Sequence, residues 1–171
     1  IELVIVNLYP FEKKLSENKS FEEIIENIDI GGPSMLRSAA KNFSDVTVVS
    51  SINYYDDLIK ELNVHGGATS IEFRKKMANE TFNETAYYDS LISNWFSKEN
   101  KIKFPNKKTI SGKLVGKLRY GENPHQTGAL YSVINNNNFS NFDQLMGKEM
   151  SYNNYLDAFN AFELVSEFKN G

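Results

Sequence analysis

Short apolar runs alternate with helical periodicity along the first part of the chain. Residues 3–6 form a β-rich apolar run that predicts a parallel strand covered on both faces, and residues 46–49 predict another strand. Apolar residues at helical spacing predict helices over about 20–28, 33–43, 54–62 and 69–96, the last in one piece or two. Strands that alternate with helices indicate a mostly parallel α/β sheet.

Two of the predicted helix starts carry local signals. Ser20 and Glu23 have the spacing of a capping box, in which each side chain bonds a backbone amide at the helix start. Pro33 suits the first turn of the next helix, because its missing N–H would have no partner there. The chain opens directly on a predicted buried strand, which predicts that further sequence precedes Ile1.

Polar residues follow the first predicted strand and flank the paired glycines at 31–32. Asn7 and Tyr9 come directly after that strand, where ligands sit in open α/β sheets. Asp29 and Lys41 could exchange protons if they meet in a cleft, and a glycine lets the backbone approach a ligand closely. An ordinary salt bridge and a helix-capping glycine explain the same residues, and spacing alone favours that interpretation.

The composition changes after the long predicted helix. Residues 97–117 are rich in Lys, Asn, Ser and Gly, which predicts a domain boundary. A turn-rich motif at 118–126, a strand at 129–133 and an asparagine run at 135–138, which predicts a loop, come next. A last helix is predicted over about 155–168, with its inward face formed by Ala158, Ala161, Phe162 and Val165.

The turn-rich motif is dense in polar side chains. Arg119 suits bidentate recognition of phosphate, and Tyr120 could stack on a base. Asn123, His125 and Gln126 complete the cluster. A structural turn held by the glycine and the proline of the same motif is an equally good explanation of these residues.

Composition and charge narrow the possible functions. The chain has 171 residues, of which 40% are hydrophobic and 24% charged, a mixture typical of a globular protein. Its net charge of -3 gives no electrostatic reason to bind nucleic acid, and no apolar run approaches the length of a membrane span. The absence of cysteine excludes disulfides and Cys-based zinc sites and suits a reducing cytosol, and two histidines exclude a multi-His metal site.

Five motifs together resemble the family of bifunctional purine-biosynthesis proteins that join IMP cyclohydrolase to AICAR transformylase. They occur in the family's order and span nearly the whole chain. The motifs are Asn-Leu-Tyr-Pro-Phe at 7–11, Ile-Asp-Ile-Gly-Gly at 28–32, Arg-Ser-Ala-Ala-Lys-Asn at 37–42, Thr-Ala-Tyr-Tyr-Asp at 85–89 and Leu-Arg-Tyr-Gly-Glu-Asn-Pro-His-Gln at 118–126.

The resemblance implies an α/β fold in two parts. Residues 1–100 would be the C-terminal part of a parallel-sheet cyclohydrolase domain similar to methylglyoxal synthase, residues 101–117 a linker, and residues 118–171 the start of a deaminase-like α/β transformylase domain. In the family, AICAR takes a formyl group from the co-substrate 10-formyltetrahydrofolate, and formyl-AICAR then closes its ring to IMP with loss of water. The resemblance also implies a cytoplasmic homodimer that needs no metal.

The resemblance assigns roles to residues in both clusters. Lys41 matches the proton-transfer lysine of ring closure, with Tyr9 and Asp29 as its partners. The positions that match purine contacts are Val6, Asn7, Ile30 and Gly31. The positions that match contacts to the AICAR nucleotide are Arg119, Tyr120, His125 of the same motif, and Asn154.

Family features outside this stretch limit what the chain can do alone. In the family, a phosphate-binding loop and a second active-site lysine come upstream, and a Lys-His pair that drives formyl transfer comes downstream. We therefore expect neither activity from residues 1–171 by themselves. Two alternatives stay open: a catalytically silent nucleotide-binding module of the allosteric-sensor type, and a structural fragment whose polar clusters are simple turns.

Overall fold

The computed structural model describes residues 1–17, 19–133 and 144–168, which fall into two compact units. The first unit is Ile1–Thr109 and the second is Ile110–Gly171. The division falls within residues 97–117, the stretch whose composition predicts a boundary. The asparagine run at 135–138, predicted to be a loop, lies outside the described residues.

The sheet of the first unit consists of two parallel strands, as predicted. Strand β1 (Leu3–Ile5) pairs with β2 (Thr47–Val49), with Val4 opposite Val48. The expectation that the first strand is covered on both faces is wrong. All of β2 is buried because α3 and α5 contact it, whereas Leu3 and Ile5 on β1 are 39% and 43% exposed.

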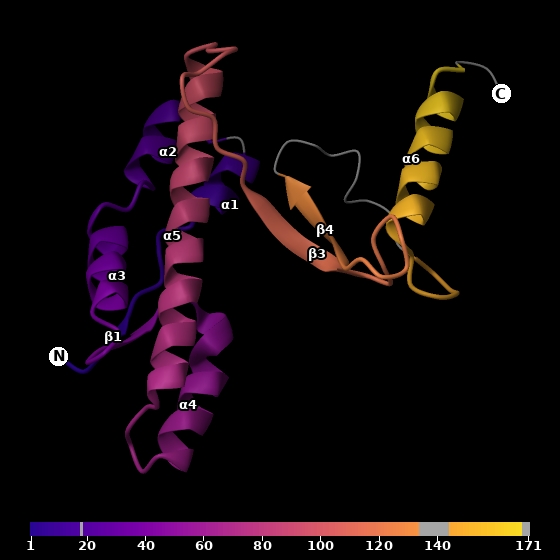
Figure 1. The fold of residues 1–171 in the computed structure, drawn as a ribbon. Helices are drawn as coiled ribbons and strands as arrows, with labels where there is room; N and C mark the ends of the chain where they lie inside the picture. Colours follow the sequence, from indigo (N-terminus) through magenta and orange to yellow (C-terminus); the bar gives the residue numbers. More distant parts are fainter. Residues whose placement is uncertain (18, 134–143, 169–171) are drawn as a thin grey trace. The chain divides into compact units, whose positions relative to one another are not determined.

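A single long helix dominates the first unit. Helix α5 (Ile71–Glu99) is continuous over 29 residues, about 44 Å long, and contacts α3 (Gly31–Lys41) and β2 (Figure 1). The Ser70 hydroxyl accepts a hydrogen bond from the Phe73 amide and caps its start. The 3₁₀ turn η1 (Ile52–Tyr54) and helix α4 (Tyr55–Val64) complete the unit.

The core of the first unit lies where α3, β2 and α5 meet. Its fully buried side chains include Leu36, Val48 and Met77, which are at most 1% exposed. Phe82 on α5 is 39% exposed, and the Arg37 guanidinium lies 5.5 Å from its ring centroid. Small polar residues of α5 take the interior places instead: Thr81 and Thr85 are fully buried.

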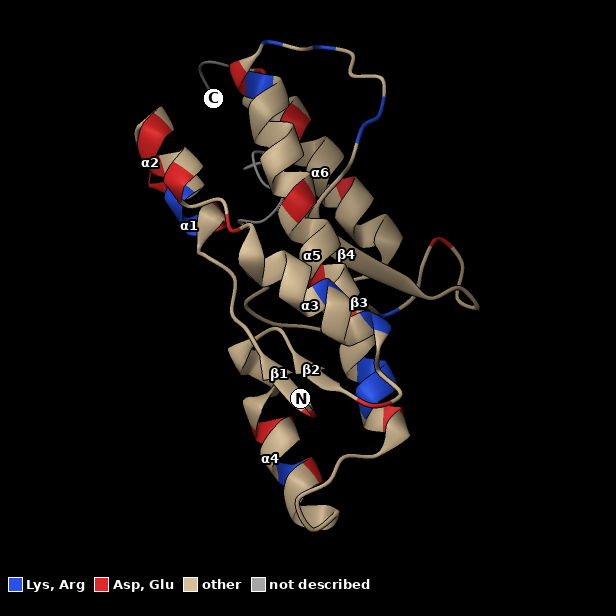
Figure 2. Ribbon diagram, turned by 90° about the vertical axis from the view of Figure 1, so that its left-hand side faces the viewer, with Lys and Arg blue, Asp and Glu red and all other residues tan. Residues whose placement is uncertain are grey.

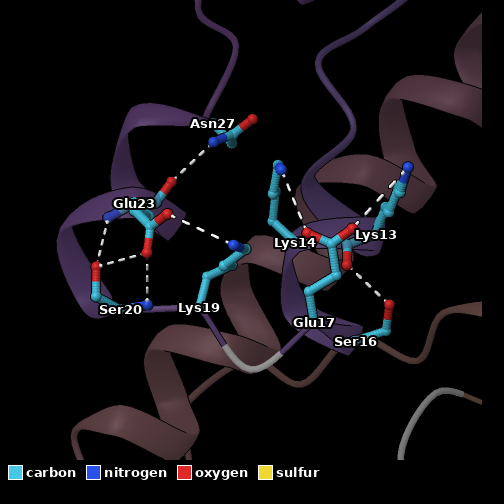
Figure 3. Close-up of polar contacts among 8 residues, drawn as sticks. All are labelled: Lys13, Lys14, Ser16, Glu17, Lys19, Ser20, Glu23 and Asn27. Carbon is cyan, nitrogen blue, oxygen red and sulfur yellow. Dashed lines mark hydrogen bonds and ion pairs between the residues drawn. The ribbon is translucent and has the colours of Figure 1, made fainter.

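Two short helices, α1 (Phe11–Ser16) and α2 (Phe21–Glu26), pack beside α5. Phe11 anchors them, because it is fully buried with its ring edge-on to Tyr88 and Trp95 at centroid distances of 5.9 and 6.0 Å. Figure 3 shows the predicted capping box at the start of α2, where the Glu23 amide donates to the Ser20 hydroxyl and the Ser20 amide donates to the Glu23 carboxylate, each over 3.2 Å.

The second unit is built on an antiparallel ribbon. Strand β3 (Gly112–Leu118) pairs with β4 (Gly128–Val133), with an irregularity between Leu114 and Gly116. The sequence analysis missed β3 and treated residues 112–117 as linker, because glycines and lysines obscure its alternation of apolar and polar positions.

Helix α6 (Tyr152–Ser166) follows the ribbon and begins three residues earlier than predicted, because Ser151 caps it. Its predicted inward face is wrong. No residue of α6 is buried, and Phe162 and Val165 are 53% and 68% exposed.

Acidic and basic positions are interspersed along the chain, and α2 carries three glutamates and no basic residue (Figure 2). Across the described ranges, no helix combines the length and the apolar character needed to cross a bilayer.

Candidate functional site

The carboxyl ends of β1 and β2 meet at one edge of the parallel sheet. Because the strands run in the same direction, Asn7 after β1 and Ser50 after β2 come to the same place. A pocket of about 280 Å³ opens there, called the strand-end pocket below. Its polar lining consists of Asn7, Tyr9, Glu12, Ser50, Ser51, Glu84, Tyr87 and Tyr88.

Asp29 joins the segment after β1 to the start of α3. Its Oδ1 accepts a hydrogen bond from the Gly32 amide over 2.7 Å, and its Oδ2 accepts one from the Tyr9 amide over 3.3 Å. The Asp29 amide in turn donates to the Tyr88 hydroxyl over 2.8 Å, and that hydroxyl donates to the Asn27 carbonyl. The structure thus brings Asp29 and Tyr9 together through the backbone of Tyr9, while the Tyr9 side chain is 56% exposed.

The two glycines at the start of α3 have different surroundings. A Cβ at Gly32 would lie 2.5 Å from Asp29 Oδ2, whereas a Cβ at Gly31 would meet nothing within 4 Å. Helix α3 starts two residues before the predicted position at Pro33. The Asp29 carboxylate accepts the hydrogen bond of the Gly32 amide, which has no partner within the first turn. Ile30 and Gly31 are both exposed there.

Lys41 lies at the other end of the same helix. Helix α3 is 11 residues long, so its ends are about 15 Å apart along the axis. Lys41 is exposed, and within the described part of the chain it makes no hydrogen bond or ion pair. Its side chain therefore does not meet the Asp29 carboxylate, either as a proton-exchanging pair or as an ordinary salt bridge. Helical side chains lean toward the N-terminus, so a long lysine covers part of that separation.

The other two predicted purine contacts after β1 are partly engaged within the protein. Val6 donates its amide to the Val49 carbonyl over 3.1 Å, and its side chain packs against the core. The Asn7 amide nitrogen donates to the Tyr55 hydroxyl over 2.8 Å, which leaves its side-chain oxygen as an acceptor.

The motif at 118–126 is a turn that bonds to itself. The Gly121 amide donates to the Gln126 carbonyl over 2.8 Å, and the Gln126 amide donates to the Asn123 carbonyl over 2.9 Å. The Gln126 side-chain oxygen accepts from the Asn123 amide over 2.8 Å. The interpretation of this motif as a structural turn therefore holds for Gly121, Asn123 and Gln126.

Arg119 and Tyr120 form a stacked pair at the start of this turn. The Arg119 guanidinium lies 4.9 Å from the Tyr120 ring centroid and donates to the Tyr120 hydroxyl over 3.2 Å. The Ser151 side chain and the Arg119 charge lower the pKa of Tyr120. Backbone bonds from Arg119 to Met150 and from Tyr152 to Tyr120 link the end of β3 to the start of α6.

Asn154 and His125 lie in different surroundings of the second unit. The Asn154 side-chain oxygen accepts from the Ser151 amide and hydroxyl, each over 3.0 Å, and so caps α6. His125 lines an open hollow of about 650 Å³ together with Glu122, Gln126 and Tyr152, among others. Arg119, Tyr120 and Asn154 are outside that lining, so the structure does not gather all four predicted nucleotide contacts in one pocket.

Comparison with known proteins settles the family. The family model for the AICARFT/IMPCHase bienzyme matches residues 39–171. This chain belongs to the AICARFT/IMPCHase bienzyme family. The resemblance seen in the five sequence motifs is thereby confirmed.

Individual bienzyme relatives match over almost the full chain. The bifunctional purine biosynthesis protein PurH of Prochlorococcus marinus (strain MIT 9515) is 52% identical over 168 residues, and PurH of Bradyrhizobium diazoefficiens is 47% identical over 169. Each alignment covers 98% of this chain and 32% of the relative, so the chain spans about a third of their length. The crystal structure of ForH is 34% identical and covers 57% of this chain and 50% of that chain, at a TM-score of 0.45 that supports no argument about the fold.

The sequence analysis missed several residues of the strand-end pocket. Ser50 and Ser51 directly follow the second strand, so the rule that placed Asn7 after the first strand could have found them. Glu84 and Tyr87 come from the middle of α5, and no local signal marks them. The described residues hold no group of three or more potential metal ligands.

Proposed function

We propose that the protein containing this chain performs the final two steps of IMP formation. The amine of AICAR takes the formyl group of its co-substrate 10-formyltetrahydrofolate, and formyl-AICAR then closes its ring to IMP with loss of water. The observation that carries this proposal is the family match together with about half identity to PurH proteins across nearly the whole chain. A catalytic metal has no place in the proposal.

The two units correspond to parts of two catalytic domains in this proposal. The first, with its parallel strands and covering helices, is the C-terminal part of a methylglyoxal-synthase-like cyclohydrolase domain. The second, with its ribbon and helix, begins the deaminase-like transformylase domain. The division of the chain between residues 109 and 110 supports this assignment. The complete protein is a cytoplasmic homodimer with active sites shared between chains.

Ring closure requires a proton to move and a negative oxygen to be stabilised. The carboxamide nitrogen of formyl-AICAR attacks the formyl carbon, a C–N bond forms, and the formyl oxygen leaves as water after proton transfers. Two backbone amides fix the Asp29 carboxylate, which suits it to hold or accept a proton at a defined place. Lys41 has a long, exposed side chain that donates the proton, and Tyr9 and the Gly31 backbone orient the base.

The second cluster holds the AICAR nucleotide in this proposal. Arg119 keeps guanidinium donors for a phosphate beyond its one bond to Tyr120, and Tyr120 offers a ring face. His125 lies at an open hollow, and the Asn154 side-chain NH₂ is available as a donor because its cap uses the oxygen.

An assay of both steps tests the proposed function. The complete protein that contains this chain is incubated with AICAR and 10-formyltetrahydrofolate, and formyl-AICAR and IMP are measured separately. We expect both products, and residues 1–171 alone should form neither. A complete protein that forms neither product would refute the proposal.

The separation of Lys41 from Asp29 favours one second candidate, a nucleotide-binding module without turnover. Such a module would bind IMP and change its thermal stability, yet it would not convert supplied formyl-AICAR to IMP. Measuring IMP binding and ring closure on the same preparation separates the two candidates.

A further inference from the structure

Ser50 has an unusual position at the strand-end pocket. Its side chain is 4% exposed and lines the pocket. Within the described ranges no hydrogen bond to its hydroxyl is found. The enclosed side-chain atoms without a partner there are Arg74 Nε and Thr81 Oγ1, so the Ser50 hydroxyl keeps contact with the open space of the pocket. The neighbouring Ser51 differs, because its hydroxyl accepts from the Asn53 amide over 3.3 Å. A hydroxyl of a nearly buried residue that faces a cavity without a protein partner indicates a place where a ligand can bond.

The charge of the pocket is of one sign. Glu12 and Glu84 contribute carboxylates, and the pocket lining contains no lysine, arginine or histidine. Each carboxylate offers about four acceptor sites, so a bond within the protein leaves room for a ligand donor. An anion such as a phosphate would meet two like charges here and no compensating donor cation.

Tyr87 lies in the field of these two carboxylates. Burial first, and then the Glu12 and Glu84 carboxylates, raise the pKa of the Tyr87 hydroxyl. Burial is also the main cause that raises the pKa of Tyr88, and the hydrogen bond with the Asp29 backbone opposes it; the carboxylates that raise this pKa, Asp29 and Asp89, lie outside the pocket lining. A cation placed in the pocket would relieve this excess of negative charge.

The remaining walls suit the carbon part of a small ligand. Leu8, Phe11, Ile52 and Leu91 are apolar, and the tyrosine rings add faces that attract cations. The volume of about 280 Å³ is at the lower limit of ligand pockets, which restricts the occupant to a small molecule.

We propose that the strand-end pocket binds a small organic cation carrying a primary ammonium group, which donates to Ser50 Oγ and to the carboxylates of Glu84 and Glu12. An ammonium has three donors, and the pocket offers three acceptor groups to match, one hydroxyl and two carboxylates. The aliphatic part of the ligand lies against the apolar wall. The pocket lining includes Asn7 and Tyr9, which the proposed purine site also uses, so the diamine and a purine nucleotide would compete there.

A titration of the whole chain with 1,4-diaminobutane tests this proposal. Backbone amide signals are followed by NMR, with 1,4-butanediol as a neutral ligand of the same length and inorganic phosphate as an anion. We expect saturable shifts at amides of the lining, such as Leu8, Ser51 and Tyr87, with the diamine alone. The affinity should fall as salt is added, because screening weakens the attraction.

Four variants sharpen the test. Glu84→Gln and Ser50→Ala should each weaken diamine binding by about tenfold, since each removes a bond to a charged donor. Glu99→Gln, a matched change on the same helix at an exposed position away from the pocket, should leave the affinity unchanged. The amide spectrum of each variant shows whether it is folded, and Ser50→Thr, which keeps the hydroxyl, should bind better than Ser50→Ala.

Several results would overturn the proposal. The butanediol could produce the same shifts, the diamine shifts could be spread over other acidic surfaces, or folded Glu84→Gln could bind as tightly as the parent. A parallel titration with IMP reports on the proposed purine site at Asn7, Asp29 and Gly31. Failure of the diamine with IMP binding intact would reject this site alone, whereas the purine site is rejected only if IMP also fails to bind the complete protein.

Discussion

Asp29 is the residue on which the geometry of the candidate purine site depends. Its two carboxylate oxygens hold the Tyr9 amide and the Gly32 amide, and its own amide is held by the Tyr88 hydroxyl. Four interacting residues from three different segments are therefore fixed relative to one another. Any change that moves the Asp29 carboxylate should loosen the segment after β1 and the start of α3 together.

Gly32→Ala tests this dependence. The new Cβ would overlap the Asp29 carboxylate, which lies 2.5 Å from its ideal position, and displacing that group removes two hydrogen bonds. We expect a loss of about 1–3 kcal/mol in the free energy of unfolding, measured with urea.

Gly31→Ala is the matched control for that change. No atom lies within 4 Å of its added Cβ, and alanine is a better helix former than glycine, so stability should stay the same or rise by up to about 1 kcal/mol. Equal losses in both variants would show that glycine flexibility, and not the contact with Asp29, matters at this helix start.

At the level of elements, the start of α2 is held by local bonds more than by packing. Ser20 and Glu23 exchange bonds with each other's backbone amides, and Ile24 is the buried residue of this six-residue helix. Those bonds lower the pKa of the Glu23 carboxyl. Because the pKa is lower in the folded state, this contribution is present above the ordinary value of 4.5 and is lost as the pH falls through the folded value.

Ser20→Ala should cost about 1 kcal/mol of unfolding free energy at neutral pH, since it removes the acceptor for the Glu23 amide. The measurement is urea unfolding followed by circular dichroism. Ser16→Ala is the control, because the Ser16 hydroxyl donates to the Lys13 carbonyl within α1 and caps no helix start. A Ser20→Ala variant no less stable than Ser16→Ala would show that the capping box contributes nothing measurable.

Local patterns predict elements well where neighbouring residues decide the outcome. The capping box at Ser20 and the parallel pair of strands follow from spacing and from β-branched runs, and both are confirmed. Strand β3 escaped prediction because its glycines and lysines resemble a linker, and the antiparallel partner that stabilises it is remote from it in sequence. The exposed face of α6 could not be foreseen either, because periodicity shows an apolar face but not what covers it.

The candidate site was predictable only in part for the same reason. The rule for strand ends found Asn7 and Tyr9, and the contact of Asp29 with the Tyr9 segment is present. The position of Lys41 follows from the length of α3, which puts it at the far end of the helix. Ser50 and Glu84 join the pocket through tertiary packing, which spacing along the chain does not report.

At the scale of the whole molecule, the chain is two units joined by an exposed basic segment. Residues 101–110 contain four lysines, and each of them is exposed. Both units keep their own internal contacts on either side of the division between residues 109 and 110.

Limited digestion with trypsin should therefore cut first at Lys101, Lys103, Lys107 or Lys108, because exposed backbone outside helices and strands is cleaved most readily. Mass spectrometry should show an early fragment that ends within residues 101–108. Early cuts at Lys75 or Lys76, which are equally exposed but lie within α5, would contradict the division into two units.

The central functional claim is that Lys41 donates the proton in ring closure, across the length of α3 from Asp29. The most direct measurement compares Lys41→Ala with Lys60→Ala, an exposed lysine on α4, in the complete protein, by following ring closure of supplied formyl-AICAR and formyl transfer to AICAR separately. The account predicts that Lys41→Ala lowers the rate of ring closure by about a hundredfold or more and keeps formyl transfer, while Lys60→Ala changes neither rate. Ring closure at the parental rate in Lys41→Ala would contradict it.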